Sequence, residues 1–366
     1  MISLGASGLG KWGNGSILPK EVMVCENRFV ISNAGMQANF WDVFVKCRDN
    51  GIKQIITIDM WQSSGHLVPS ETQLRYTVKS IVDSLITNGI KRDKAVFQLD
   101  NEPAKYGVPM GLYCNQANIV HSELAGLYDL YVGSDECTYI SWYNNIVPNC
   151  NCEGIAFHLQ NSALNTISTD ASVDFIKNLA TQYGKKITCS EGNYLDPSVE
   201  YSYNMIKYHI QKCKEIGALD YCVIFLELAN QDKYKWLSFV YNNVVRSQFY
   251  DDYMQLIENE KEELLMEYLR PLVQQAFYGA MGWGGKPYHN NTPSLPIAGR
   301  KVETNPITWA DLDAVFETLT KGLVKSLMDN GALPAEFPKP MDIKYFADGT
   351  YNNNWRTIAN SNPEGS

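Results

Sequence analysis

The sequence predicts an α/β protein in which residues 1–248 form a closed (β/α)8 barrel, a TIM barrel, followed by a mainly helical C-terminal appendage. Three observations predict this fold. Apolar, strand-like runs alternate with longer helical patterns, and eight such units fit the length of one α/β barrel. The strand-like runs are apolar throughout, as expected of parallel strands that are buried on both faces. An open doubly wound sheet would usually stop at about five or six strands.

The predicted strands are short apolar runs, and six of them are clear. These six cover residues 54–60, 95–101, 128–134, 154–160, 186–192 and 221–228. Residues 2–6 and 27–32 provide two weaker strands at the start of the chain, which brings the total to eight. The glycine-rich segment 6–15 lacks the strand-to-helix setting of a dinucleotide-binding loop, so we expect it to be an ordinary loop.

Helices are predicted where apolar residues recur at helical spacing between the strands. These patterns lie near residues 37–49, 71–88, 114–126, 171–183, 198–216 and 232–247. Alternation of this kind places each helix on the outside of the barrel, where it covers the strands.

The pattern changes after the predicted barrel. Residues 250–280 read as a charged helix that we expect Pro271 to kink or end. Thr308 stands three residues before Asp311, which resembles a capping box and predicts a second helix that continues to about residue 331. We therefore expect three parts: a barrel at 1–248, a helical appendage at 249–331 and an irregular tail at 332–366.

The composition excludes several classes of function. The chain has 31 Lys and Arg against 40 Asp and Glu, a formal net charge of −9, and it contains no basic run. Binding to nucleic acid or anionic lipid needs clustered positive charge, so neither partner is expected. No run approaches the ~18 apolar residues of a membrane span, and no secretory signal is visible. We expect a soluble chain without membrane insertion, either cytoplasmic or released or virion-associated without a signal.

The nine cysteines do not suggest a disulfide framework. Their number is odd and most fall inside predicted strands and helices, which favours buried free thiols. Cys150 and Cys152 form a C-x-C pair, but no second pair stands at zinc-like spacing. The sequence therefore predicts neither a metal site nor an organic cofactor.

Two carboxylates end predicted strands that should meet at one rim. Asn101-Glu102-Pro103 follows the strand at 95–101, and Glu191 lies at the end of the strand at 186–192. These are the fourth and seventh strands, and a barrel carries its functional groups at the C-terminal ends of its strands. Paired carboxylates on either side of a glycosidic bond are the groups that hydrolyse it.

This arrangement resembles the clan A glycoside hydrolases, which are (β/α)8 retaining enzymes. They carry an Asn-Glu pair, often Asn-Glu-Pro, at the end of strand four and a Glu at the end of strand seven. The resemblance covers roughly residues 1–248. It implies Glu102 as acid/base, Glu191 as nucleophile and Asn101 as a donor to the sugar hydroxyl next to the reacting carbon. It also matches Arg28 to the arginine that clan members often carry beside the nucleophile.

Three further residues have alternative interpretations. His158, in the sixth strand, either lies near the site or is a structural histidine that points outward. Trp61 either stacks on a sugar ring or packs in the core. Glu227 stands at the end of strand eight, where many clan members have a tryptophan, and is either a polar subsite contact, an ion-pair partner of the site or a sign that the substrate is not a plain neutral glucan.

The predicted function is retaining hydrolysis of a poly- or oligosaccharide, with a cell-wall polymer as one candidate substrate. Retention requires the two carboxyl groups to lie only about 5 to 5.5 Å apart, so one proton should be shared between them. The alternative is a non-catalytic barrel that binds carbohydrate or serves as a structural module, such as a phage virion or assembly component. In either case the C-terminal helices are candidates for self-association or assembly.

Overall fold

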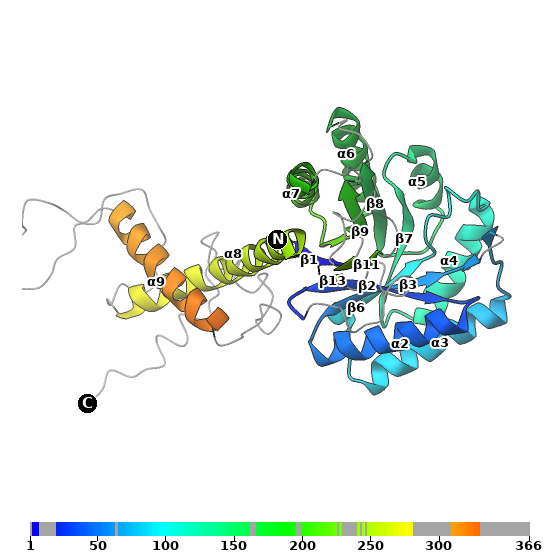
Figure 1. The fold of residues 1–366 in the computed structure, drawn as a ribbon, viewed down its shortest axis with the longest axis horizontal. Helices are drawn as coiled ribbons and strands as arrows, with labels where there is room; N and C mark the ends of the chain where they lie inside the picture. Colours follow the sequence, from blue (N-terminus) through cyan, green and yellow to red (C-terminus); the bar gives the residue numbers. More distant parts are fainter. Residues whose placement is uncertain are drawn as a thin grey trace, which may run out of the picture. The chain divides into compact units, whose positions relative to one another are not determined.

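A computed structural model shows a closed barrel of eight parallel strands, in the order β1-β10-β9-β8-β7-β6-β3-β2 around the barrel (Figure 1). The structure describes residues 2–6, 20–62, 65–161, 166–194, 199–224, 227–228, 240–241, 244–245, 247–280 and 309–329. The predicted (β/α)8 fold is confirmed.

All eight predicted strands are present, including the two weak ones near the N-terminus. They are β1 (Ser3–Ala6), β2 (Val24–Val30), β3 (Lys53–Asp59), β6 (Ala95–Leu99), β7 (Asp129–Glu136), β8 (Gly154–Asn161), β9 (Lys186–Tyr194) and β10 (Asp220–Val223). The eighth strand is shorter than predicted, because its pairing with β9 is already irregular between Tyr221 and Val223. A small separate sheet contains β11 (Glu227–Leu228), β12 (Val240–Tyr241) and β13 (Val244–Val245).

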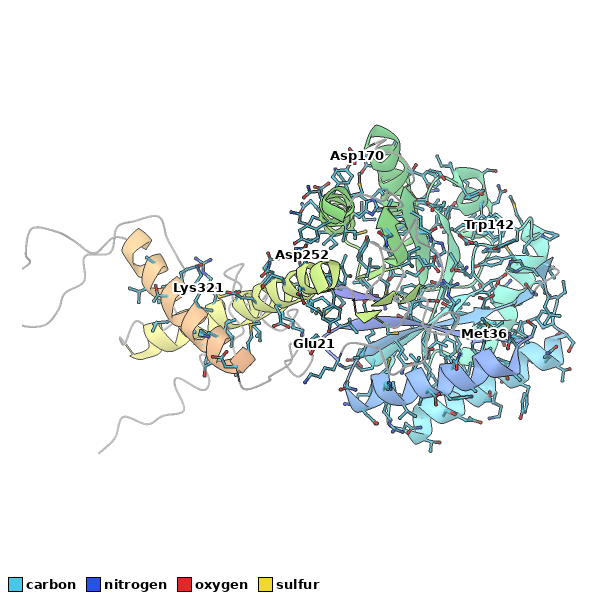
Figure 2. All side chains as sticks on the ribbon, viewed as in Figure 1. Glu21, Met36, Trp142, Asp170, Asp252 and Lys321 are labelled. Atoms are coloured by element: carbon cyan, nitrogen blue, oxygen red, sulfur yellow. The ribbon has the colours of Figure 1, made fainter. Side chains whose placement is uncertain are left out.

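Within the part of the chain that the structure describes, six helices connect the barrel strands and lie outside them (Figure 1). They are α2 (Ala34–Asp49), α3 (Glu71–Thr87), α4 (Met110–Leu124), α5 (Ile140–Ile146), α6 (Thr166–Tyr183) and α7 (Val199–Glu215). The side chain of Ser70 caps α3 by accepting a 3.2 Å hydrogen bond from the Gln73 amide. In Figure 2, Asp170 marks α6, and its carboxylate pairs with Lys212 of α7 at 3.3 Å.

Two connections differ from the sequence prediction. Helix α5 was not predicted because its seven residues are too few to show a helical period. It is held by packing, since Trp142 (Figure 2) and Tyr143 are buried. The helix predicted near 232–247 is wrong where the structure describes this segment: β12 and β13 pair antiparallel there, as the valine-rich residues favour.

A layer of buried side chains fills the inside of the barrel. Its members come from six different strands: Val24, Ile55, Val96, Tyr131, Ala156 and Cys222. The Tyr131 ring occupies the space beside Gly154, where an added Cβ would lie 2.6 Å from the ring. A larger residue than glycine is therefore excluded at this position unless the tyrosine moves.

The C-terminal part contains two long helices, α8 (Ser247–Ala280) and α9 (Trp309–Asp329). Helix α8 continues past residue 271, so the helix does not end at Pro271, and the alternative of a kink there stays a prediction. The chain divides into two compact units, Met1–Ile257 and Glu258–Ser366. In the first, the Tyr253 hydroxyl of α8 donates a 2.8 Å hydrogen bond to the Gly5 carbonyl of β1.

The second unit has a small apolar cluster of its own. Leu265 and Leu269 of α8 pack against Val324 of α9, and Arg270 pairs with Glu317 at 3.7 Å. Residues 282–306 and the predicted tail at 332–366 lie outside the described residues.

Two general expectations can be compared with the described residues. All nine cysteines are free, and eight of them are buried, which confirms the predicted thiols. Within the described ranges, none of the helices combines the length and apolar character needed to cross a membrane.

Candidate active site

The two predicted carboxylates lie at the same end of the barrel. Glu102 follows β6, the fourth barrel strand, and Glu191 lies near the end of β9, the seventh. Only 8% of Glu102 and 5% of Glu191 is exposed to solvent. In a barrel of this kind, the functional site lies at the C-terminal ends of the strands.

The turn that carries Glu102 has an unusual backbone. Asp100 and Glu102 adopt positive φ angles, of 59° and 53°, which side chains other than glycine rarely occupy. The Asp100 carboxylate holds the turn by accepting hydrogen bonds from the amides of Met60 at 3.2 Å and Asn101 at 2.9 Å. Such strain persists only where surrounding contacts enforce it, and it is concentrated at functional sites.

The neighbouring strand β7 fixes the rest of this turn. The Glu102 amide donates to the Ser134 carbonyl at 2.8 Å. The Asp135 carboxylate accepts from the amides of Ala104 at 2.6 Å and Lys105 at 3.2 Å. Burial raises the pKa of Asp135 to about 7, although these two amide donors oppose the shift. Asp135 was not among the predicted site residues.

Glu191 is paired with a buried arginine. The Arg28 guanidinium forms an ion pair with Glu191, and it also contacts Glu26 at 2.9 Å and Asp59 at 4.0 Å. Burial alone would lower the pKa of Arg28, but the charges of Glu26, Asp59 and then Glu102 raise it. Arg28 therefore stays charged, interacts with Glu191 directly and senses the charge of Glu102.

His158 lies beside Glu191 and points into the site. Its β8 position pairs with Glu191 in the sheet, and its Nδ1 lies 3.8 Å from Glu191 Oε2. It is completely buried, and neither ring nitrogen has a hydrogen-bond partner in the described part of the chain. Burial, followed by the positive charges of Arg28 and Lys105, holds the pKa of His158 well below its usual range. The imidazole is therefore neutral at pH 7.

Amides complete the surroundings of the two carboxylates. Gln160 donates from its side chain to Glu191 Oε2. Asn101 is 7% exposed, and its side-chain oxygen has no hydrogen-bond partner among the described residues. The Asn101 amide is thus placed next to Glu102 with hydrogen-bonding capacity left over.

The other two predicted residues can be placed only by their backbone. Trp61 belongs to β4 (Trp61–Gln62), which pairs antiparallel with β5 (Gly65–His66), and Glu227 belongs to β11. The side chains of both lie outside the described residues. His66 of β5 was not predicted, and its Nδ1 lies 3.0 Å from the Asp100 carboxylate.

Two charged partners of the site were also missed by the sequence analysis. Lys105 Nζ contacts both carboxylate oxygens of Glu102, each at 2.7 Å. Glu26 lies two residues before Arg28 on β2, and the period of a strand puts both on one face. That period could have identified Glu26, whereas the Lys105 contact depends on a turn conformation that no pattern predicts.

The cluster has a chemical character distinct from a metal centre. Among the residues that the structure describes, no three His, Cys, Asp or Glu side chains are grouped as ligands for a metal ion. The carboxylates are instead matched with fixed cations, as Glu191 is with Arg28 and Glu102 with Lys105. Carboxylates supported in this way can exchange protons or act as nucleophiles.

Comparison with known proteins shows that the fold of this chain is similar to that of several solved structures. No protein-family model and no curated protein matches the sequence. A mutant endo-β-1,4-glucanase from Xanthomonas axonopodis pv. citri is similar in structure, with a TM-score of 0.52 and 10% identity over 70% of this chain and 100% of that one. Thermotoga maritima Cel5A, in a mutant form, has a TM-score of 0.51 and 9% identity over 70% and 96% of the two chains.

A third similar structure is an endo-β-1,4-mannanase from Thermotoga petrophila, with a TM-score of 0.50 and 11% identity over 70% of this chain and 77% of that one. Because fold alone does not determine function, the chemistry has to come from the site itself. The chain shares its (β/α)8 fold with these three structures.

Proposed function

We propose that this protein is a retaining glycoside hydrolase that cleaves O-glycosidic bonds of a poly- or oligosaccharide. The observation that carries the proposal is the pair Glu102 and Glu191, which come from the fourth and seventh barrel strands into one buried polar cluster. Arg28 links the two, because it pairs with Glu191 and senses the charge of Glu102.

The proposed mechanism is a double displacement. Glu191 attacks the anomeric carbon as a carboxylate while Glu102 gives its proton to the departing oxygen, which leaves a glycosyl ester on Glu191. Glu102 then removes a proton from water, the water oxygen displaces Glu191, and the sugar leaves with its original anomeric configuration.

The surrounding side chains have separate roles in this proposal. Arg28 keeps Glu191 ionised, and Gln160 orients it through the Glu191 Oε2 contact. Asn101 binds the sugar hydroxyl next to the reacting carbon. His158, being neutral, is a donor or acceptor close to the same sugar. Trp61 and Glu227 remain candidates for contacts with more distant sugar units.

The substrate is proposed from the chemistry of similar folds. The similar structures include an endo-β-1,4-glucanase and an endo-β-1,4-mannanase, so β-glucans and mannans are the first polymers to test. Chitin and peptidoglycan belong in the same panel, because a cell-wall polymer suits the additional C-terminal unit if that unit serves in binding or assembly. We propose that residues 1–248 are the catalytic part and that the C-terminal unit serves in binding or assembly.

A non-catalytic barrel is the second candidate, and one observation favours it. Both carboxylates are already paired with cations and are almost completely buried, as a purely structural ion-pair network would be. Such a protein would bind carbohydrate or support an assembly without cleaving a bond.

One experiment separates these two candidates. The full-length protein and its Glu102→Gln and Glu191→Gln variants are incubated with the polysaccharide panel, and new reducing ends are measured. Glu123→Gln is the matched control, because that glutamate pairs with Arg75 on the outer helices. Cleavage that both site variants lose and the control keeps supports the proposal. Cleavage that survives in both variants contradicts it, and NMR of the first-formed anomer tests retention.

A further inference from the structure

The contact between Lys105 and Glu102 raises a question about the acid/base. Lys105 Nζ lies 2.7 Å from each oxygen of Glu102, in the same turn and three residues further along. A cation on both oxygens favours the carboxylate. The proposed reaction nevertheless requires Glu102 to carry a proton when the glycosidic oxygen departs.

The turn allows this cation to move without disturbing the backbone. The Lys105 amide is anchored on Asp135 at 3.2 Å, and the Glu102 amide is anchored on Ser134 at 2.8 Å. The Lys105 side chain is 48% exposed, whereas that of Glu102 is 10% exposed. The Lys105 side chain is therefore long and half exposed on a fixed backbone. Rotation about its side-chain bonds can bring its ammonium to another partner.

A second carboxyl group, that of Glu136, and the ammonium of Lys105 influence each other's pKa through their charges. Glu136 follows Ser134 and Asp135 on β7, the segment to which the Glu102 turn is hydrogen-bonded. Burial raises the pKa of Glu136 to about 8, and the charge of Glu102 adds to this rise, while the amide of Gln160 and the ammonium of Lys105 oppose it. At pH 7 Glu136 is therefore mainly protonated.

The ammonium itself remains charged in this environment. Burial lowers the pKa of Lys105, but the hydrogen bond to Glu102 and the charges of Glu102 and Glu136 raise it overall. The other groups that face Lys105 and Glu102 from the surrounding elements are Arg28 on β2, Asp100 in the turn after β6, Asp135 on β7, His158 on β8 and Tyr106 beside Lys105.

We propose that Lys105 is a positioning residue that holds Glu102 as a carboxylate in the resting site and transfers to Glu136 when Glu102 takes up the proton for the leaving group. This inference rests on the function proposed above. The step is balanced: one proton passes from Glu136 to Glu102, and the ammonium moves from Glu102 to Glu136. The total charge of the three side chains is unchanged, so the exchange avoids creating a new net charge in a buried site.

Enzyme kinetics provide the first test. In Lys105→Met, loss of the ammonium removes its stabilisation of the Glu102 carboxylate, so the alkaline limb of the kcat/KM profile should move up by about one pH unit. Lys105→Arg should restore the wild-type limb, and Glu136→Gln should lower kcat/KM at pH 7 by about tenfold or more, because the proton source is lost.

Lys79→Met is the control for these variants, because Lys79 pairs with Asp83 at 3.0 Å on the outside of α3 and leaves the site untouched. Its pH profile should match that of the wild type. If Lys105→Met instead lowers kcat/KM equally at every pH, with the alkaline limb in place, Lys105 has only a structural role and the proposal is overturned.

A second measurement does not depend on activity. Glutamate side-chain carboxyls are labelled with ¹³C in the full-length protein, and the Glu102 signal is identified by its loss in Glu102→Gln. The titration midpoint of this signal should rise by about one pH unit in Lys105→Met. An unchanged midpoint contradicts the Lys105 proposal even if the protein is active. A raised midpoint in a protein that cleaves none of the polysaccharides supports Lys105 pairing and counts against the proposed function.

Discussion

The two carboxylates of the site are held by different kinds of cation on different kinds of backbone. Glu191 lies on a strand and pairs with Arg28, of which only 4% is exposed. Glu102 lies on a turn with a positive φ angle and pairs with Lys105, whose side chain is half exposed. A group that stays ionised is thus matched with an immobile guanidinium, and a group that must gain and lose a proton is matched with a cation that can move.

This difference matches the properties of the two cations. Arginine stays charged when buried and binds carboxylates with a rigid fork of donors, whereas lysine is a point charge on a flexible chain. We therefore expect Glu191 to be held by a cation that stays in place, and Glu102 to be held by a cation that can move when Glu102 gains a proton.

Removing each carboxylate should have unequal consequences. Glu191→Gln should lower kcat by at least about 10³-fold on every cleaved substrate, because no covalent intermediate can form. Glu102→Gln should lower it by about 10²- to 10⁴-fold on natural polymers but spare the first step for aryl glycosides with good leaving groups. A burst of aryl alcohol, followed by slow turnover, would identify that pattern. Equal losses with both classes of substrate would contradict the distinction.

Removing the fixed cation should destabilise the barrel. Arg28→Met leaves Glu26, Asp59 and Glu191 buried without their shared partner, and breaking a buried pair costs about 3 to 5 kcal/mol. Denaturant unfolding of the full-length variant measures this loss. Arg48→Met is the control, since Arg48 pairs with Asp49 at the surface and its removal should cost far less stability than that of Arg28. Equal stability of the two variants would show that the ion pairs of Arg28 do not stabilise the fold.

The fold was largely predictable because strands buried on both faces leave continuous apolar runs. The short β1, with only four residues, was a weak prediction that completed the count of eight. Helix α5 was missed because packing of Trp142, and not helical periodicity, holds it. Glu102 and Glu191 were predictable because they end strands, whereas the Lys105 contact depends on the positive φ angle of Glu102. Backbone strain enforced by neighbouring strands leaves no repeating pattern in a sequence.

The protonated carboxyl next to Glu102 should make stability depend on pH. The pKa of Glu136 is raised to about 8 when folded, so between its ordinary pKa near 4.5 and about 8 the folded state holds more protons than the unfolded state. Stability should therefore fall as the pH rises through this window. Glu136→Gln should remove part of that fall, on the order of 1 to 3 kcal/mol at pH 8 relative to pH 5.

Urea unfolding of wild type and Glu136→Gln at both pH values measures this difference, with Glu123→Gln as the control for loss of a carboxylate at the barrel surface. A Glu136→Gln protein whose stability changes with pH as steeply as the wild type would mean that Glu136 is ionised in the folded state. The proton that we assign to it would then have to come from elsewhere.

The smallest effect is expected for the movable cation. Lys105→Met should change the free energy of unfolding by less than about 1 kcal/mol, because Lys105 is half exposed and water can replace its contact with Glu102. Denaturant unfolding at pH 7 measures this change beside that of Arg28→Met. A loss of several kcal/mol in Lys105→Met would place Lys105 among the fixed parts of the site, because a cation that holds the fold together cannot leave its partner in each catalytic cycle.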